Sequence, residues 1–320
     1  MTPEKKRTVL IAGAGHLGSR YLQSLTSVAV PLEIHLLSPD PHSLSACADR
    51  WADAGGHATH HTVVNHLTSK ALPQAIDLVV VSSTADVRVE LVEMIATTID
   101  VNYWLVEKVL AQHPLDLERL SRATAAAKGA WVNYYMLSEA LYSEVKAHLS
   151  QSHPIHVKVS GFEWGLACNG LHFIHLHRWL NDSPINSLRE ERLAPSWHPA
   201  KRPGYWEIYG ELGATCFNGA ELSLSVQEGL LGYRLLLQDG SLEWEIFEET
   251  GVALRSDGLR IACPVAYQSA RPLLSDILLT GTCKLPRLQD VLTTDSHFLQ
   301  LMLDCWRRLK DQNACRVPIT

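Results

Sequence analysis

The feature that most constrains this chain is a set of three closely spaced glycines near its beginning. Gly13, Gly15 and Gly18 follow an apolar stretch of strand length at residues 8–12 and precede a helical pattern. In such a turn the first glycine lets the chain reverse, the second leaves room for a pyrophosphate, and the third lets helix and strand pack closely. The amides of the helix N-terminus then face the phosphates. The spacing predicts a dinucleotide-binding turn.

Strands and helices alternate over the first third of the chain. Apolar runs predict strands at residues 32–37, 76–82 and 101–106. Between them apolar residues recur at helical spacing, and a further helix begins near Asp116. This alternation is typical of α/β proteins and predicts a Rossmann-type, doubly wound parallel sheet. We expect this nucleotide-binding domain to cover residues 1–130.

The pattern changes in the second half of the chain. In residues 221–227 and 241–246 apolar and polar residues alternate with period two, as in strands with one wet face. Dipeptides of the Asn-Gly or Asp-Gly type, which favour tight hairpins, lie between such runs at residues 218–219, 239–240 and 257–258. These features predict an α+β domain with a mostly antiparallel open sheet over residues 131–320. It ends with a helix whose expected N-cap is Asp295.

Composition limits the classes of protein that fit. A chain of 320 residues with 46% hydrophobic and 19% charged residues can form two folded domains. Its seven cysteines contain no Cys-x-x-Cys pair, which fits reduced thiols. The net charge of -6 and the lack of a long basic run argue against nucleic acid or an anionic membrane as the main partner. We expect a cytoplasmic protein that acts on a small molecule.

A Glu107-Lys108 pair follows the predicted strand at residues 101–106. Ligands bind at this edge of an open parallel sheet. A lysine placed there, beside a cationic nicotinamide and partly removed from water, can exchange a proton with a substrate hydroxyl or carbonyl, and Glu107 can hold it in place. An ion pair at the protein surface is the alternative interpretation of the same two residues.

Histidines gather in a second segment, from Trp164 to His177. If residues 170–180 are helical, His172 and His175 lie three residues apart on one face. Imidazoles suit proton transfer near neutral pH. They are also common metal ligands, which would fit a metal-assisted hydrolase. We favour a site without metal, because no carboxylate joins the histidines at ligand spacing.

In these motifs and their order the chain resembles the Gfo/Idh/MocA family of oxidoreductases, which includes glucose-fructose oxidoreductase and inositol dehydrogenase. The resemblance rests on the glycine turn, the Glu-Lys pair and the Gly-Leu-His segment, and covers nearly the whole chain. It implies that NAD or NADP binds in the first domain, and that a carbon of a sugar or cyclitol is oxidised or reduced. It makes Lys108 the proton-relay lysine and His172 the substrate-contacting or acid-base histidine. Residues 169–174 are most similar to members linked to surface-polysaccharide and amino-sugar biosynthesis.

The sequence departs from the pattern of this family at several positions. The family often has one aspartate four residues before the histidine and another three residues after it, where this chain has Cys168 and His175. Val109 replaces the proline after the Glu-Lys pair, and Thr84-Ala85 replaces a Thr-Pro. One acid-base partner is therefore missing. Reduced or altered activity follows as one hypothesis, and a non-catalytic NAD(P)-binding sensor or scaffold as another.

The choice of cofactor depends on the end of the second predicted strand. Ser38 stands where NAD enzymes commonly place an acid, and Asp40 follows in the same loop. Because serine does not repel a phosphate, the sequence slightly favours NADP over NAD. The glycine turn and the family resemblance together indicate the other expected cofactor-binding residues, which are His16, Leu17, Ser83, Thr84 and Glu107.

The residues expected to contact the substrate come from the second half of the chain. They are Trp164, Asn169 and His175, with Arg178, Trp179 and Tyr205 as further lining candidates. An open sheet also leaves one face for water or a partner. We expect a homodimer or homotetramer formed through this sheet, with Leu235, Leu236 and Leu237 among the contacts.

Overall fold

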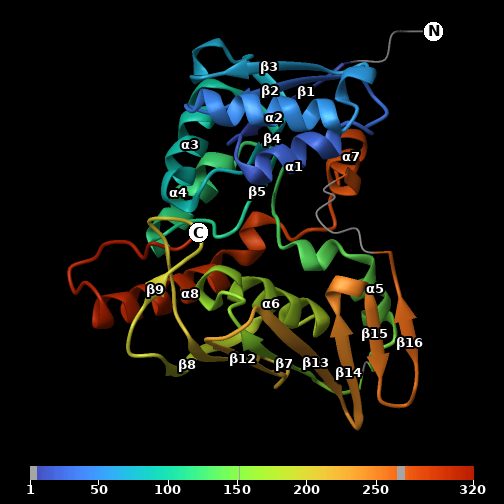
Figure 1. The fold of residues 1–320 in the computed structure, drawn as a ribbon, viewed down its shortest axis with the longest axis vertical. Coiled ribbons are helices and arrows are strands. Elements are labelled where there is room, and N and C mark those ends of the chain that lie inside the picture. Colours follow the sequence, from blue (N-terminus) through green and yellow to red (C-terminus); the bar gives the residue numbers. More distant parts are fainter. Residues whose placement is uncertain (1–5, 151, 265–270) are drawn as a thin grey trace. The chain divides into compact units, whose positions relative to one another are not determined.

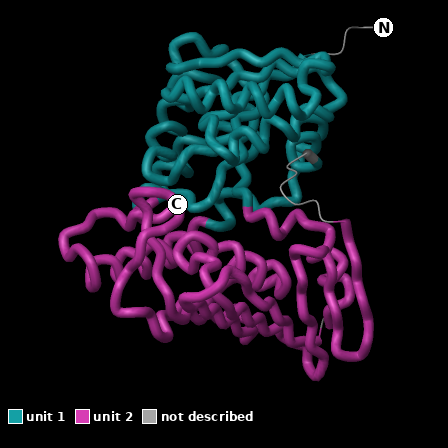
Figure 2. Tube along the Cα trace, in the orientation of Figure 1, with its two compact units in different colours: residues 1–111, 115–133, 267–291 teal, residues 112–114, 134–266, 292–320 magenta. Residues whose placement is uncertain are grey.

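The structure of the chain is a computed structural model that describes residues 6–150, 152–264 and 271–320. The described parts form two compact units (Figure 2). Unit 1 has the bounds 1–111, 115–133 and 267–291, and unit 2 has the bounds 112–114, 134–266 and 292–320. Unit 1 therefore combines most of the first 133 residues with a segment from near the end of the chain.

Unit 1 is built on a parallel six-stranded sheet. Its strands are β1 (Arg7–Ala12), β2 (Leu32–Leu37), β3 (Thr62–His66), β4 (Ala75–Val81), β5 (Asp100–Val106) and β6 (Gly129–Val132). They run in the order β3-β2-β1-β4-β5-β6, and all neighbours are parallel (Figure 1). The three strands predicted from apolar runs are confirmed, and so is the doubly wound sheet.

The helices of unit 1 pack against this sheet. They are α1 (His16–Leu25), α2 (Pro41–Asp53), α3 (Ala85–Thr98), α4 (Pro114–Thr124) and α7 (Arg271–Thr280), with short 3-10 helices at Gly56–Ala58 and Ser69–Ala71. Val9, Ile11 and Ile34 form one core cluster with α1, α2 and α7. Leu10 and Val79 are equally buried but point to the opposite face, because side chains alternate along a strand. Both faces of the sheet are therefore covered.

Unit 2 is built on an eight-stranded sheet. Its strands are β7 (Ile155–Phe162), β8 (Ile185–Leu193), β11 (Gly210–Cys216), β12 (Glu221–Gln227), β13 (Gly232–Asp239), β14 (Leu242–Phe247), β15 (Val252–Arg255) and β16 (Arg260–Ala262). Their order is β16-β15-β14-β13-β7-β12-β11-β8, and only the β7–β12 pair among them is parallel. A separate ribbon joins β9 (His198–Pro199) to β10 (Trp206–Glu207). The predicted, mostly antiparallel sheet is confirmed.

The three predicted hairpin turns are present. They join β11 to β12, β13 to β14 and β15 to β16. Gly219, Gly240 and Gly258 have φ angles of +85°, +60° and +98°. Residues with a Cβ rarely adopt these left-handed angles, so the Asn-Gly and Asp-Gly dipeptides fix the register of the strands that they join.

Helix α6 lies in the core of unit 2. The helices here are α5 (Ala140–Ala147), α6 (Leu166–Leu180) and α8 (Leu288–Leu309), with short 3-10 helices at Tyr135–Ser138 and Glu248–Thr250. A Cβ on Gly170 of α6 would lie 3.3 Å from Phe298 of α8 and 3.8 Å from Leu224 of β12. The missing side chain therefore lets α6 pack tightly between the sheet and α8. No helix in the described ranges has the length and hydropathy that crossing a membrane requires.

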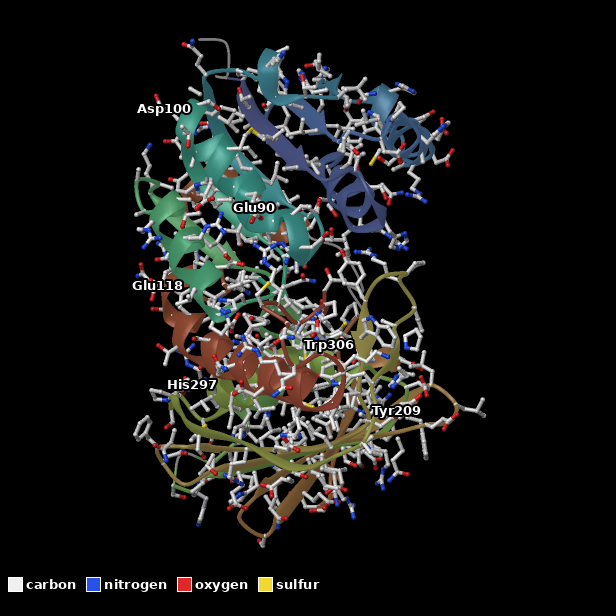
Figure 3. The ribbon with its side chains drawn as sticks, turned by 90° about the vertical axis from the view of Figure 1, so that its left-hand side faces the viewer. Glu90, Asp100, Glu118, Tyr209, His297 and Trp306 are labelled. Carbon is white, nitrogen blue, oxygen red and sulfur yellow. The ribbon has the colours of Figure 1, made fainter. Side chains whose placement is uncertain are left out.

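The C-terminal helix starts earlier than its sequence pattern predicts. α8 begins at Leu288, and Asp295, the expected N-cap, is 0% exposed inside it. That prediction was wrong because Asp295 lies on the buried stripe of the helix, three residues before Phe298, where a polar residue resembles a helix boundary. Further along α8 lies Trp306, which is labelled in Figure 3. The centroid of its ring is 5.2 Å from that of Trp197 and 5.6 Å from that of Trp206.

The open face of the large sheet carries both charged and apolar side chains. Leu235 and Leu237, expected at a subunit contact, are 0% exposed in the core of unit 2, and of this segment only Leu236 lies on the open face. This correction follows from the strand period of two, which sends adjacent residues to opposite faces. Beside Leu236, Arg234 forms an ion pair of 2.8 Å with Glu245. The oligomeric state itself stays a prediction.

Candidate active site

The glycine turn joins β1 to α1 in unit 1. Gly13 has a φ of +113°, and a Cβ there would lie 2.7 Å from the backbone nitrogen of Ser83. A Cβ on Gly18 would collide with the carbonyl oxygen of Gly13, which accepts a 2.7 Å hydrogen bond from Ser82 Oγ. The first and third glycines are therefore required by the packing of the turn against the end of β4.

Gly15 has a different role in this turn. Its φ is -73°, and a Cβ there would meet no atom within 4 Å. Gly15 is the N-cap residue of α1 and has no side chain that could accept a hydrogen bond from the helix. The first backbone amides of α1 therefore receive no cap from this residue, and His16 and Leu17 beside them are exposed. An open helix N-terminus next to a residue without a side chain fits the pyrophosphate of a dinucleotide.

The loop after β2 carries the two residues expected to decide the choice of cofactor. Ser38 is 6% exposed, and its Oγ lies 2.8 Å from Ser43 Oγ. Asp40 is the N-cap of α2, and its carboxylate accepts hydrogen bonds from the backbone nitrogens of His42 and Ser43, at 3.0 and 3.2 Å. Both oxygens of the Asp40 carboxylate thus serve to start α2.

Glu107 is buried in a polar network inside unit 1. Its Oε1 accepts hydrogen bonds from Tyr21 Oη and, at 2.8 Å, from Asn133 Nδ2. Asn133 Nδ2 also donates to Tyr21 Oη at 2.6 Å. Burial first, and then the charge of Glu107, raise the pKa of Tyr21 well above its usual value, so the phenol remains a donor. The network joins α1 to the ends of β5 and β6.

Lys108 follows Glu107 and is partly exposed. The Lys108–Val109 peptide bond is cis. Arg88 of α3 is 2% exposed, and its guanidinium donates to the carbonyl oxygens of Val109 and Ser83. Thr84, next to Ser83, is the N-cap residue of α3. The buried guanidinium therefore ties the segment after β4 to the segment after β5 that carries Lys108.

Replacing Arg88 by methionine should destabilise unit 1. Methionine fills much of the same volume but leaves the Ser83 and Val109 carbonyls without this donor. Because an unsatisfied buried polar group costs about 1–3 kcal/mol, we expect the free energy of unfolding to fall by about 2–4 kcal/mol in urea denaturation. Arg122→Met is the control, since the Arg122 side chain is 72% exposed. Equal effects of the two substitutions would contradict the role of Arg88.

The three histidines of α6 are buried in unit 2. His172, His175 and His177 are 6%, 1% and 0% exposed. Burial lowers the pKa of His177 to about 4, so this imidazole is a neutral part of the core. His172 contacts two tyrosine rings, whose centroids are 5.8 Å away for Tyr134 and 4.7 Å away for Tyr135, both in edge-on geometry. The rings fix the plane of the His172 imidazole.

His175 contacts a carboxylate that comes from α8. Its Nε2 lies 2.7 Å from Asp295 Oδ1, and Tyr134 Oη donates to Asp295 Oδ2 at 2.5 Å. The Tyr134 ring also stacks on His175, with centroids 4.0 Å apart and planes inclined by 29°. His175, expected to face the substrate, is thus placed inside unit 2 as the partner of Asp295.

Glu207 of β10 closes the N-terminus of α6. Its carboxylate accepts hydrogen bonds from the backbone nitrogens of Ala167 and Cys168, at 2.8 and 3.0 Å. Gly165 precedes the helix with a φ of +79°, and a Cβ there would lie 2.8 Å from Glu207 Oε1. The carboxylate opposes the helix dipole, so this N-terminus is satisfied by the protein itself, in contrast to that of α1.

The residues expected to line the substrate site differ in environment. Trp164 is 5% exposed, and its Nε1 donates to the Ser225 carbonyl at 3.0 Å, so it belongs to the core of unit 2. Asn169 is partly exposed and donates to the Trp164 carbonyl at 2.6 Å. The Lys146 ammonium lies 4.4 Å above the ring of Trp179. Two further candidates are partly exposed: Arg178 and Tyr205.

Four of the cysteines have thiols that are largely shielded from water. Burial raises the pKa of four thiols to about 11, so they stay protonated: Cys47, Cys216, Cys283 and Cys305. Within the described ranges, no group of three or more His, Cys, Asp or Glu side chains could hold a metal ion.

Sequence analysis missed the residues that hold the segment with Lys108 and the helix α6 in place. These are Tyr21, Arg88, Asn133, Tyr134, Glu207 and Asp295. Most of them bind partners that are distant in the chain. One signal was available in the sequence, since Asp295 lies on the same helical stripe as Phe298 and Met302. An acidic residue on a buried stripe requires hydrogen-bond partners.

Comparison with known proteins identifies the fold. No protein family and no curated protein sequence matches the chain, whereas many solved structures do. Myo-inositol 2-dehydrogenase from Lactobacillus plantarum is 14% identical, with a TM-score of 0.67 over 95% of this chain and 97% of that one. GenD2 from gentamicin A biosynthesis, solved in complex with NAD, is 14% identical, with a TM-score of 0.67 over 98% and 97% of the two chains.

The chain has the fold of the Gfo/Idh/MocA oxidoreductases. The same fold occurs in the transcriptional regulator Gal80p from Kluyveromyces lactis, which is 14% identical, with a TM-score of 0.70 over 97% of this chain and 90% of that one. The fold is therefore common to dehydrogenases and to a regulator. A function for this chain has to be argued from its own residues.

Proposed function

We propose that the chain is an NAD(P)-dependent oxidoreductase that transfers a hydride between nicotinamide and a sugar, a sugar nucleotide or a related hydroxyl or carbonyl compound. The observation that carries this proposal is at the glycine turn, where Gly15 faces open space beside the uncapped N-terminus of α1. Enzymes of the same fold, including one solved with NAD, support the choice of cofactor class.

In this proposal the residues of the chain bind, orient and move protons. Nicotinamide, when bound, would supply or accept the hydride. The backbone amides at residues 15–17 would hold the pyrophosphate. Lys108 would take the proton from a substrate hydroxyl during oxidation, or return one to the carbonyl oxygen during reduction, and His172 would contact the substrate as a second acid-base group. Arg88 would keep the segment that carries Lys108 in place.

A non-catalytic NAD(P)-binding regulator or scaffold is the second candidate function. Two observations favour it. Cys168 and His175 stand where the resembled family often has aspartates, and a transcriptional regulator shares the fold. This candidate requires the same cofactor site but no turnover.

The experiment that separates these candidates combines binding with turnover. The purified chain is titrated calorimetrically with NADP and with NAD. It is then incubated with each cofactor and a panel of sugars, cyclitols and sugar nucleotides while nicotinamide absorbance is followed. Binding with turnover supports the oxidoreductase, and binding without turnover across the panel supports the regulator. A folded protein that binds neither cofactor would contradict both.

Between the two cofactors, we expect NADP to bind more tightly than NAD. Ser38 brings no negative charge to the loop after β2, and both carboxylate oxygens of Asp40 are engaged in capping α2. We expect NADP to bind at least about 5-fold more tightly than NAD, or by ~1 kcal/mol, in calorimetric titrations. In Ser38→Asp the new carboxylate should repel the 2′-phosphate of NADP, so that NAD binds more tightly. Tighter binding of NAD by the unaltered chain would contradict the expectation.

A further inference from the structure

We propose that Asp295, His175 and Tyr134 form a buried positioning group for the imidazole of His172. This inference rests on the proposed function, in which His172 contacts the substrate. It concerns a carboxylate that α6 itself lacks, since Cys168 and His175 occupy the positions where the resembled family often has aspartates. The carboxylate comes instead from α8.

The carboxylate of Asp295 is fully engaged within unit 2. Asp295 is 0% exposed, and its two oxygens are 2.7 Å from His175 Nε2 and 2.5 Å from Tyr134 Oη. A carboxylate in the interior is costly unless each oxygen accepts a hydrogen bond. Hydrogen bonds to a charged group are also the stronger ones, so Asp295 fixes both of its partners firmly.

Tyr134 transmits this constraint to His172. Its hydroxyl is bound to Asp295, one face of its ring stacks on His175 at 4.0 Å, and the ring meets His172 edge-on at an interplanar angle of 89°. Tyr135 also meets His172 edge-on, with centroids 4.7 Å apart. A change in the bond between Tyr134 and Asp295 would therefore reach the ring of His172.

The hydrogen bonds of His175 indicate which of its ring nitrogens carries the proton. Nε2 donates to Asp295, and Nδ1 is buried without a hydrogen-bond partner in the described ranges. A proton on Nδ1 would be an unsatisfied buried donor, so the neutral Nε2–H form fits this site. The Nε2–H bond to Asp295 then holds the His175 ring on which Tyr134 stacks.

The test follows the His172 ring by nitrogen NMR of histidine-labelled protein, with His172→Gln used to assign the signal. Asp295→Asn removes the charge but keeps the shape. It should change the nitrogen shifts and the tautomer ratio of the His172 ring. Tyr134→Phe keeps the ring but cuts the bond to Asp295, and should change the tautomer shifts of His172. These readouts need no substrate, so they remain informative if the proposed oxidoreductase activity fails.

Asp239→Asn is the matched control in the same unit. Asp239 is 5% exposed, and its carboxylate accepts a 2.8 Å hydrogen bond from the backbone of Ser150. This control should leave the nitrogen shifts of His172 unchanged. Where turnover is found, Asp295→Asn should reduce kcat by about 10- to 100-fold with little change in KM. Unaltered nitrogen shifts of His172 in folded Asp295→Asn and Tyr134→Phe proteins would overturn the proposal.

Discussion

Replacing Gly15 by valine should remove cofactor binding while the chain stays folded. A Cβ at this position meets no protein atom within 4 Å, and its φ of -73° is open to any residue. The added side chain would instead fill the space that the pyrophosphate needs beside the first amides of α1. We expect NADP and NAD to bind at least about 100-fold more weakly, or ~2.7 kcal/mol, by calorimetry.

The matched control for this substitution is Gly232→Val on β13. A Cβ on Gly232 also meets nothing within 4 Å, but Gly232 belongs to the sheet of unit 2. The cofactor affinity of Gly232→Val should equal that of the unaltered chain. The free energy of unfolding of both variants should lie within about 1 kcal/mol of the value for the unaltered chain. Full cofactor affinity in Gly15→Val would place the nucleotide elsewhere.

Replacing Lys108 by methionine should remove turnover without removing the cofactor. Methionine keeps the length of the side chain but has no proton to transfer. General acid-base groups contribute about 10²–10⁴-fold to rate, so we expect kcat to fall by that factor. The affinity for NADP should change little, because the glycine turn that holds the phosphates is untouched. Steady-state kinetics and calorimetry on the same preparation measure both quantities.

Lys70→Met serves as the control for the loss of an ammonium group in unit 1. Lys70 is exposed on the short 3-10 helix at Ser69–Ala71, and its removal should leave kcat unchanged. Unchanged kcat in Lys108→Met would reject the lysine as the proton relay. Loss of cofactor affinity in that variant, with kcat unaffected at saturation, would assign Lys108 to binding instead.

Local sequence signals were sufficient to predict much of the fold. The strand at residues 32–37 and the hairpins at Gly219, Gly240 and Gly258 depend on periodicity and turn chemistry within a few residues. The packing of α7 within unit 1, in contrast, could not be predicted from local sequence signals. Leu274 and Ile277 belong to the same core cluster as residues of α1 and α2, which precede them by more than 200 residues in the chain. Periodicity shows that such a helix has an apolar face but not which surface covers it.

The candidate site likewise contains some residues that local sequence signals predict and others whose roles depend on the packing of distant elements. The glycine turn and Lys108 follow from the order of residues along one strand-turn-helix unit. The positions of Asp295 and Glu207 depend on how separate elements of unit 2 pack, so their roles appear only once α8 and β10 are in place. Asp295 was interpreted as a helix boundary because a polar residue at the edge of an apolar stripe is ambiguous between a cap and a buried partner.

A crystal structure of the chain grown with NADP tests the central claim most directly. We expect the two bridging phosphates within hydrogen-bond distance of the backbone nitrogens at residues 15–17, with the nucleotide crossing the turn above Gly15. Electron density for the nucleotide at any other surface, or a turn left empty at a saturating concentration of NADP and of NAD, would contradict the claim.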